Sequence, residues 1–138
     1  DLIDKLTFER LNKGKHISDE SYKKAKNKKK ELTQNIHELL ENFDILLTPT
    51  NFDLPFNLGD ISQIKKYYMR HARSPFNVSG NPAISVPCGL SKTNLPIGFQ
   101  IVGRYNADQF ISDIAHDFLI KTDWENIREQ NIIKNLFL

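Results

Sequence analysis

Apolar residues recur at helical spacing in three long segments of the chain. Residues 2–11 predict the last part of a helix that begins before residue 1, and Gly14 predicts a left-handed cap where that helix ends. A second helix is predicted over residues 18–42, because Ser18 is a favourable N-cap residue and two acidic residues follow it. A third is predicted over residues 107–120. The second and third segments are apolar on one side and polar on the other, so we expect these two helices to bury one face each.

Three shorter apolar runs predict β-strands. Residues 44–49 follow a helix directly and end in proline, which predicts a buried central strand. Residues 83–88 and 97–102 are of similar length and are joined by a short loop, which predicts an antiparallel pair. Because Pro87 has no N–H to donate to a neighbouring strand, we expect it near the end of its strand or at a sheet edge.

The remaining segments are shorter or irregular. Residues 51–60 are predicted to be irregular, and Asp60 or Ser62 is expected to cap a further helix that ends near His71. Residues 121–138 are interpreted as a tail that docks through apolar side chains. Those side chains are Trp124, Ile127, Ile132 and Phe137. Three strands, at least one of them apolar on both faces, need further strands and helices around them, so we expect part of a larger α/β domain.

Composition narrows the class of protein. The 138 residues are 39% hydrophobic, which is enough for a core and argues against disorder. Nineteen Lys and Arg against seventeen Asp and Glu give a net charge of +2, too balanced to indicate a nucleic-acid or membrane partner. The lysine run within residues 23–30 could contact phosphate, but a solvated helix face explains it and is preferred. No apolar run reaches the roughly 18 residues that span a bilayer. Cys88 is the single cysteine, which excludes an internal disulfide and predicts a reducing, cytoplasmic location.

Few residue patterns in the sequence indicate a catalytic, metal-binding or phosphate-binding site. The four histidines are scattered and there is no second cysteine, so we expect no metal site, and no glycine-rich phosphate loop or Gly-x-Ser-x-Gly pattern occurs. Cys88 lacks a basic neighbour that would activate its thiol, so we interpret it as a packed small hydrophobe. His71 stands between Arg70 and Arg73 and is interpreted as a surface histidine. Residues 77–79 match a glycosylation acceptor, which we interpret as accidental.

Four segments stand out when they are taken together. Residues 76–89 read Phe-Asn-Val-Ser-Gly-Asn-Pro-Ala-Ile-Ser-Val-Pro-Cys-Gly, and residues 95–104 read Leu-Pro-Ile-Gly-Phe-Gln-Ile-Val-Gly-Arg. Two further segments lie upstream of these. Residues 14–18 read Gly-Lys-His-Ile-Ser and are followed by Tyr22 and Ala25. Residues 43–50 read Phe-Asp-Ile-Leu-Leu-Thr-Pro-Thr. In this order, over residues 14 to about 120, they resemble the carboxy-terminal part of the amidase signature family.

The resemblance implies a fold and a reaction. It implies an α/β fold with a mixed β-sheet flanked by helices, in which residues 1–138 are a carboxy-terminal portion of the amidase domain and 121–138 a tail. Family members hydrolyse or transfer amides: one serine attacks the carbonyl, a cis-serine relays the proton and a lysine is the base. Those residues lie in the amino-terminal half, and this chain has neither the serine-rich loop nor the lysine motif. We therefore expect no catalytic residue, metal or cofactor here, and a chain that is inactive alone.

The motif residues are expected to hold the scaffold. The glycines permit close approach or special backbone geometry, the prolines fix the chain where the strand enters and exits, and the glutamine bonds a neighbouring loop if it is buried. These residues are Gly80, Gly89, Gly98, Gly103, Pro82, Pro87 and Gln100. No substrate-binding residue is assigned, but residues 51–60 and 70–81 are the candidate pocket walls, because ligand contacts concentrate on loops.

One departure from the family bears on the substrate. In the glutamine-using component of tRNA-dependent amidotransferases, an acidic residue usually stands several positions before the residue that aligns with Asn77. Residues 69–75 contain no acid here. A carboxylate would pair with a substrate ammonium group, whereas an arginine could not. We therefore favour a general amidase, which converts a small carboxamide into a carboxylic acid and ammonia or an amine.

Two alternatives stay open. The first is a segment of the glutamine-using amidotransferase component, which would act on aminoacyl-tRNA with partner subunits. The second is a non-catalytic remnant or split subunit that binds another chain, in which an unpaired sheet edge would be covered by association, including homo-oligomerisation. In each enzymatic case, the amino-terminal half of the amidase, or a separate chain, would supply the nucleophile.

Overall fold

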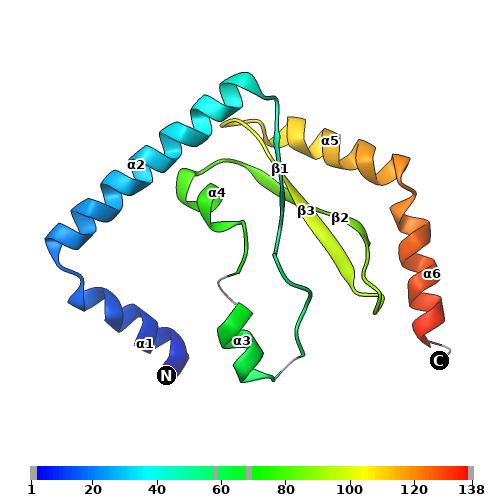
Figure 1. Ribbon diagram of the computed structural model, residues 1–138, viewed down its shortest axis with the longest axis horizontal. Coiled ribbons are helices and arrows are strands. Elements are labelled where there is room, and N and C mark those ends of the chain that lie inside the picture. Colours follow the sequence, from blue (N-terminus) through cyan, green and yellow to red (C-terminus); the bar gives the residue numbers. More distant parts are fainter. Residues whose placement is uncertain (1–2, 58, 68–69, 137–138) are drawn as a thin grey trace.

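The computed structural model describes residues 3–57, 59–67 and 70–136 (Figure 1). In chain order, the elements are α1 (Lys5–Lys13), the 3-10 turn η1 (Gly14–His16), α2 (Asp19–Asn42), β1 (Leu46–Pro49), α3 (Ile61–Tyr67), α4 (Ser74–Ser79), β2 (Ala83–Leu90), β3 (Pro96–Val102), α5 (Asp108–Lys121) and α6 (Trp124–Leu136). None of the helices in these described ranges combines the length and hydrophobicity needed to cross a lipid bilayer. The α/β class is confirmed.

The three strands form one antiparallel sheet in the order β1-β3-β2. The predicted β2–β3 hairpin is confirmed. The expectation that residues 44–49 form the central strand is wrong: in the described part of the chain, β1 pairs with β3 alone and its residues alternate between half-buried and exposed. Pro87 lies inside β2 and not at its end, next to a bulge between Pro87 and Gly89, but β2 is an edge strand of this sheet, as Pro87 predicted.

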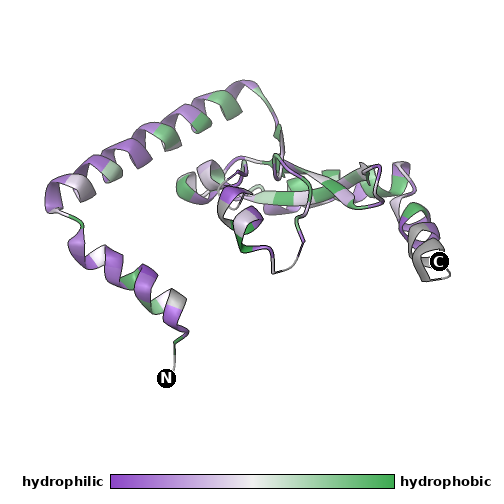
Figure 2. Ribbon diagram, turned by 60° about the horizontal axis from the view of Figure 1, so that its bottom comes forward, coloured by the Kyte–Doolittle hydropathy of each residue, from purple (hydrophilic) through white to green (hydrophobic). Residues whose placement is uncertain are grey.

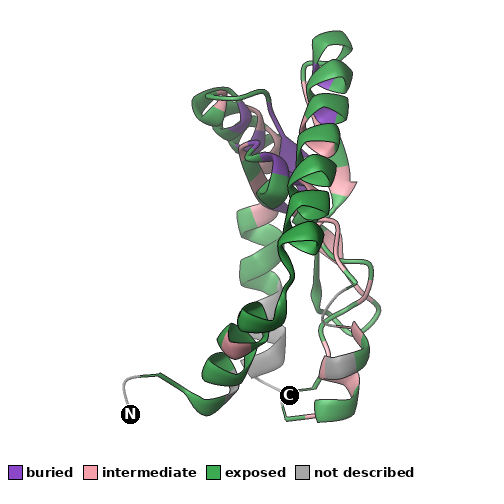
Figure 3. Ribbon diagram, turned by 90° about the vertical axis from the view of Figure 1, so that its left-hand side faces the viewer, coloured by how far each residue is buried: buried purple, intermediate pink, exposed green. Residues whose placement is uncertain are grey.

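The buried residues gather at the sheet and the helices beside it (Figure 3), and they form two clusters, one on each face of β3. Val102 packs on one face with side chains from α2 and α4, and adjacent Ile101 packs on the other with side chains from β2 and α5. Successive strand residues point to opposite faces, so one short strand serves both clusters. The buried members are Ile36, Leu40, Phe76 and Val102 in the first, and Val86, Ile101, Ile111 and Ala115 in the second.

The helix ends follow local hydrogen bonding. Ser18 caps α2 as predicted, because its Oγ accepts from the backbone N–H of Ser21 at 3.2 Å. Asp60 caps α3, since its carboxylate accepts from the backbone N–H of Gln63 at 3.0 Å, and this bond is the largest cause that lowers the pKa of Asp60. Gly14 has a φ of −61°, so the predicted left-handed cap is wrong and the chain continues into η1.

The helices differ from the sequence prediction in two segments, the one that follows Asp60 and the tail at residues 121–138. The helix predicted to reach His71 ends at Tyr67, and a short α4 follows it, with Pro75 in its first turn and Gly80 in the left-handed region at φ 86°. The predicted tail forms α6, in which Trp124 is half-buried but the side chain of Ile127 is 40% exposed. Phe137 and the side chain of Ile132 lie outside the described residues.

Helix α1 and the first half of α2 form an arm that extends away from the sheet (Figures 1 and 2). Only the second half of α2 contributes to the core, through Leu32, Ile36 and Leu40. The lysine run lies on the exposed surface of the arm, with Lys24 paired to Glu20 and Lys28 to Glu31. Large apolar side chains on the arm and in the segments next to its helices are exposed as well. They are Ile3, Phe8, Leu11, Ile17 and Tyr22.

Candidate functional site

Gln100 connects the centre of the sheet to the loops at one end of it. Its side chain is 3% exposed, and Nε2 donates to Thr48 Oγ1 at 2.7 Å and to the carbonyl oxygen of Ala72 at 3.0 Å. The prediction that a buried Gln100 would bond a neighbouring loop is therefore confirmed. The two bonds hold β1 and the segment at Ala72 against the central strand.

Backbone hydrogen bonds bring the two candidate wall segments together. The N–H of Ala72 donates to the carbonyl of Thr50 at 3.2 Å, and the N–H of Phe52 donates to the carbonyl of Arg70 at 3.2 Å. Asn51 and His71 lie between them and form an isolated antiparallel bridge. The chain after β1 therefore lies beside residues 70–72, and the Arg70 side chain of the second segment reaches Asp53 in the loop of the first.

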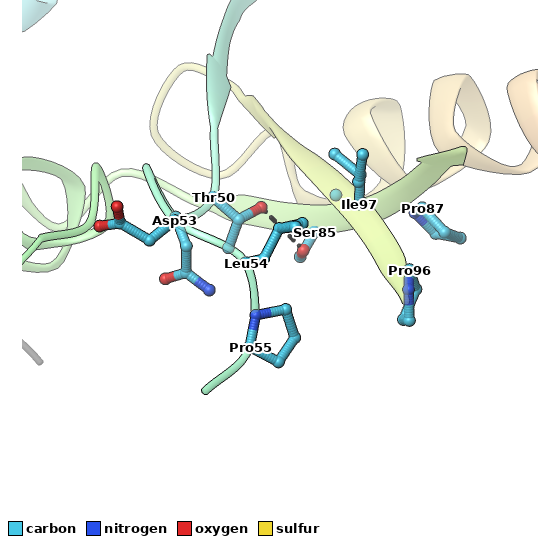
Figure 4. A pocket seen from close by; sticks show the side chains of 10 residues that line it. Thr50, Asp53, Leu54, Pro55, Ser85, Pro87, Pro96 and Ile97 are labelled. Carbon is cyan, nitrogen blue, oxygen red and sulfur yellow. Dashed lines mark hydrogen bonds between the residues drawn. The ribbon is translucent and has the colours of Figure 1, made fainter. Parts of the chain in front are cut away.

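A first hollow, the hydroxyl hollow, lies between this loop and the β2–β3 hairpin. Thr50 Oγ1 and Ser85 Oγ share a hydrogen bond of 2.9 Å, and Figure 4 places this pair between Asp53 at one end and Pro87 and Pro96 at the other. The cavity volume is about 280 Å³. Its lining residues are Thr50, Asn51, Asp53, Leu54, Pro55, Ser85, Pro87, Pro96, Ile97 and Gly98.

A second hollow, the arginine hollow, borders the same loop as the first and shares four lining residues with it. Its cavity volume is about 190 Å³. Arg70 Nε donates to Asp53 Oδ2 at 2.6 Å, and the Arg70 guanidinium lies 5.9 Å from the centre of the Tyr67 ring. The lining residues are Asn51, Asp53, Leu54, Pro55, Phe56, Tyr67, Arg70 and Arg73.

The interpretations of His71 as a surface histidine and of Cys88 as a packed small hydrophobe are wrong. His71 is half-buried, and its Nδ1 is buried without a hydrogen-bond partner, because the bridge to Asn51 draws this segment against the loop after β1. Cys88 is exposed and free, since the bulge after Pro87 turns it away from the core, and its Sγ lies 3.5 Å from the carbonyl oxygen of Ile97.

A buried polar group that the sequence did not indicate joins α4 to the end of β3. Asn81 is 8% exposed, and its Nδ2 donates to the carbonyl of Gly103 at 2.9 Å while its Oδ1 accepts from Ser79 Oγ at 2.7 Å. Tyr105 then donates to the carbonyl of Ser79 at 2.5 Å. The Asn-Pro pair after Gly80 is a turn signal, so the sequence could indicate that the helix ends there. It could not indicate the hydrogen-bond partners of Asn81.

Gly103 needs to be glycine, whereas Gly89 does not. A Cβ at residue 103 would lie 2.7 Å from Ile111 Cγ2, while one at residue 89 would meet no atom within 4 Å. We expect Gly103→Ala to lower the free energy of unfolding by about 1 to 3 kcal/mol, because it overpacks the contact between β3 and α5. The matched Gly89→Ala should change it by about 0.5 kcal/mol or less. Urea titrations of both variants measure this, and equal effects would refute the steric argument.

Comparison with known proteins identifies the family. A family model described as Amidase matches residues 3–111. The chain belongs to the amidase family. The resemblance drawn from the four sequence segments is therefore confirmed.

The relatives of this amidase chain are much longer than it. It is 40% identical over 108 residues, or 77% of its length, to the A subunit of the glutamyl-tRNA(Gln) amidotransferase of Dehalococcoides mccartyi, and 38% identical over 95 residues to that of Thermotoga maritima. The aligned part is 22% of the first relative and 20% of the second, so the chain spans about a fifth of the curated relatives it matches.

Solved structures share this part of the amidase fold. The crystal structure of the Thermotoga maritima relative has a TM-score of 0.65 at 32% identity, and the alignment covers 77% of this chain and 24% of that one. A 6-aminohexanoate cyclic dimer hydrolase has a TM-score of 0.60 at 24% identity, covering 79% of this chain and 26% of that one. At that level of identity the second comparison supports the fold alone.

Proposed function

We propose that this amidase chain is a carboxy-terminal segment of a general amidase, which hydrolyses the C–N bond of a small carboxamide to a carboxylate and ammonia or an amine. The segment contributes scaffold and part of the pocket wall, while the attacking serine, the cis-serine and the lysine that the family resemblance implies come from outside it. Three of its own serines have other partners: Ser85 bonds Thr50, Ser79 bonds Asn81, and Ser62 bonds Asp60. We also propose a cytoplasmic location, in keeping with the free thiol of Cys88.

The observation that carries the general amidase over the glutamine-using enzyme is the ion pair in the arginine hollow. Asp53 is the acidic residue that lines this hollow, and Arg70 already binds its carboxylate at 2.6 Å. Arg73 adds a further positive charge. The ammonium group of a substrate such as glutamine would meet an unfavourable environment here, because the carboxylate is already paired and the surrounding guanidinium groups repel a cation.

A second candidate is the glutamine-using component of an amidotransferase. It is favoured by the names of the relatives, which at 36% to 41% identity include the A subunits of several glutamyl-tRNA(Gln) amidotransferases. This enzyme would require aminoacyl-tRNA and partner subunits.

A non-catalytic or split subunit would instead bind another chain through the edges of β1 and β2. These edges have no further strand beside them in the described part of the chain.

One assay separates the first two candidates. The complete enzyme that contains this segment is offered hexanamide alone, and in parallel glutamine with misacylated tRNA and the partner subunits. The general amidase should release ammonia from hexanamide in the absence of tRNA. Release of ammonia from glutamine but not from hexanamide, and only when tRNA is present, would overturn the proposal in favour of the amidotransferase.

Residues 1–138 by themselves should release no ammonia from simple amides. The measurement is a coupled ammonia assay on the purified chain, with the complete product of the same gene as the positive control. The intact mass of that product in its native host should exceed 16.0 kDa several-fold. Turnover by the isolated chain that a serine-directed inhibitor abolishes would contradict the proposal.

A further inference from the structure

We propose that the arginine hollow binds a carboxylate carried by the far end of the substrate, so that the enzyme prefers amides that also bear a carboxylic acid, such as the monoamides of dicarboxylic acids. This inference rests on the proposed amidase function and names its substrate class. Arg73 is the residue assigned to contact the carboxylate, and Asp53 is a positioning residue that acts through Arg70.

The arginine hollow carries an excess of positive charge. Its lining contains two guanidinium groups and one carboxylate, which leaves one positive charge in excess. Asp53 neutralises Arg70 through the 2.6 Å contact. Among the described residues, no acidic side chain forms an ion pair with Arg73. Arg73 is exposed, so its planar fork of N–H donors is open to a carboxylate from the solvent.

The surrounding structure holds the pair of Arg70 with Asp53, and the backbone that leads to Arg73, in place. The paired backbone of residues 50–52 and 70–72 and the bond from Gln100 to the carbonyl of Ala72 fix the segment immediately before Arg73. The Asp53 side chain is only 25% exposed, so its contact with Arg70 is less screened by water than a fully exposed pair. Because this backbone is already fixed, only the Arg73 side chain has to be ordered when an anion binds.

The apolar lining indicates which anion fits. Leu54, Pro55 and Phe56 form one wall, with the Tyr67 ring also lining the hollow, and the first two residues also line the hydroxyl hollow. A chain of methylene groups can therefore lie against this wall with its carboxylate at Arg73. A single excess charge matches the single charge of a carboxylate, whereas a phosphate would bring up to two negative charges to it.

The test compares two amides of similar length in the complete enzyme. Adipic acid monoamide carries a carboxylate where hexanamide carries a methyl group. Unmodified enzyme should favour the monoamide by about 10- to 100-fold in kcat/KM, the range of one charge-assisted pair. Arg73→Gln should raise KM for the monoamide by about 10- to 100-fold, leave its kcat within about twofold, and leave hexanamide unaffected.

Further variants separate charge from shape. Arg73→Lys should retain part of the preference because it keeps the charge but loses the planar fork. Arg128→Gln removes an exposed arginine on α6, outside the arginine hollow, and should leave both substrates unaffected. In the unmodified enzyme, the preference for the monoamide should also fall as ionic strength rises, a measurement that needs no variant.

The possible outcomes separate a failure of the proposed carboxylate site from a failure of the proposed amidase function. Equal use of both amides by the unmodified enzyme, or an equal loss for both in Arg73→Gln, would overturn the carboxylate site while the amidase function stands. Hydrolysis of neither amide by the complete enzyme would overturn the proposed function and the carboxylate site together. A preference for the monoamide that Arg73→Gln removes through KM supports both.

Discussion

Leu40→Ala is expected to lower the free energy of unfolding by about 3 to 5 kcal/mol, the largest effect of any substitution considered for this chain. The Leu40 side chain is 1% exposed and lies in the cluster that joins α2 to α4 and β3. Truncation removes its buried methyl groups and leaves a cavity between three elements that cannot all collapse into it. Urea denaturation of residues 1–138, followed by circular dichroism, measures the change.

Leu39 provides a matched control on the same helix. Its side chain is 48% exposed, so Leu39→Ala should cost the chain about 1 kcal/mol or less. If the proposed amino-terminal half packs over this surface, the same substitution should become markedly more costly in the complete enzyme. Equal losses for the two variants in residues 1–138 would show that Leu40 is not a core residue of this fold.

Gln100→Met is expected to cost about 2 to 4 kcal/mol. Methionine has nearly the volume of glutamine, so packing is preserved, but Thr48 Oγ1 and the carbonyl of Ala72 each lose a donor in a partly buried site. The substitution should also loosen the segment that carries the two arginines of the hollow. Hydrogen exchange of the Ala72 N–H, which bonds the carbonyl of Thr50, should accelerate along with the loss of stability.

Gln109→Met is the control for Gln100→Met. Gln109 lies on the exposed surface of α5, where its Nε2 bonds Asp113 within the same helix. Loss of an exposed i,i+4 hydrogen bond should cost about 0.5 kcal/mol or less. If Gln100→Met proves as mild as this control, the glutamine does not hold the two loops against β3.

Elements specified by neighbouring residues were predictable. The hairpin could be inferred from its apolar runs and the glycines and prolines around them, and the start of α2 from Ser18 and the acids that follow. The hydrogen bond from Gln100 to a neighbouring loop was expected on the condition that Gln100 is buried, because a buried polar side chain needs a partner. Each of these inferences depends on residues that lie close together in the sequence.

Features that depend on distant partners were not predictable. The edge position of β1 follows from its pairing with β3, and the six residues of α4 are too few to show helical periodicity. The exposure of Cys88 depends on a bulge set by the register of β2 on β3. The arginine hollow exists because residues 50–52 pair with residues 70–72, and neither segment carries a local pattern that specifies the other as its partner.

The pairing of β1 with β3 has a consequence for how the chain is synthesised. Thr48 and its partner Gln100 are 52 residues apart, so at roughly 5 to 20 residues per second the ribosome delivers β3 about 3 to 10 s after β1. During that interval the apolar run at residues 45–47 has no strand to pair with, while the β2–β3 hairpin needs only a short loop to close. We therefore expect ribosome-associated chaperones to stay bound longest to nascent chains that have been stalled after the synthesis of β1 and before that of β3.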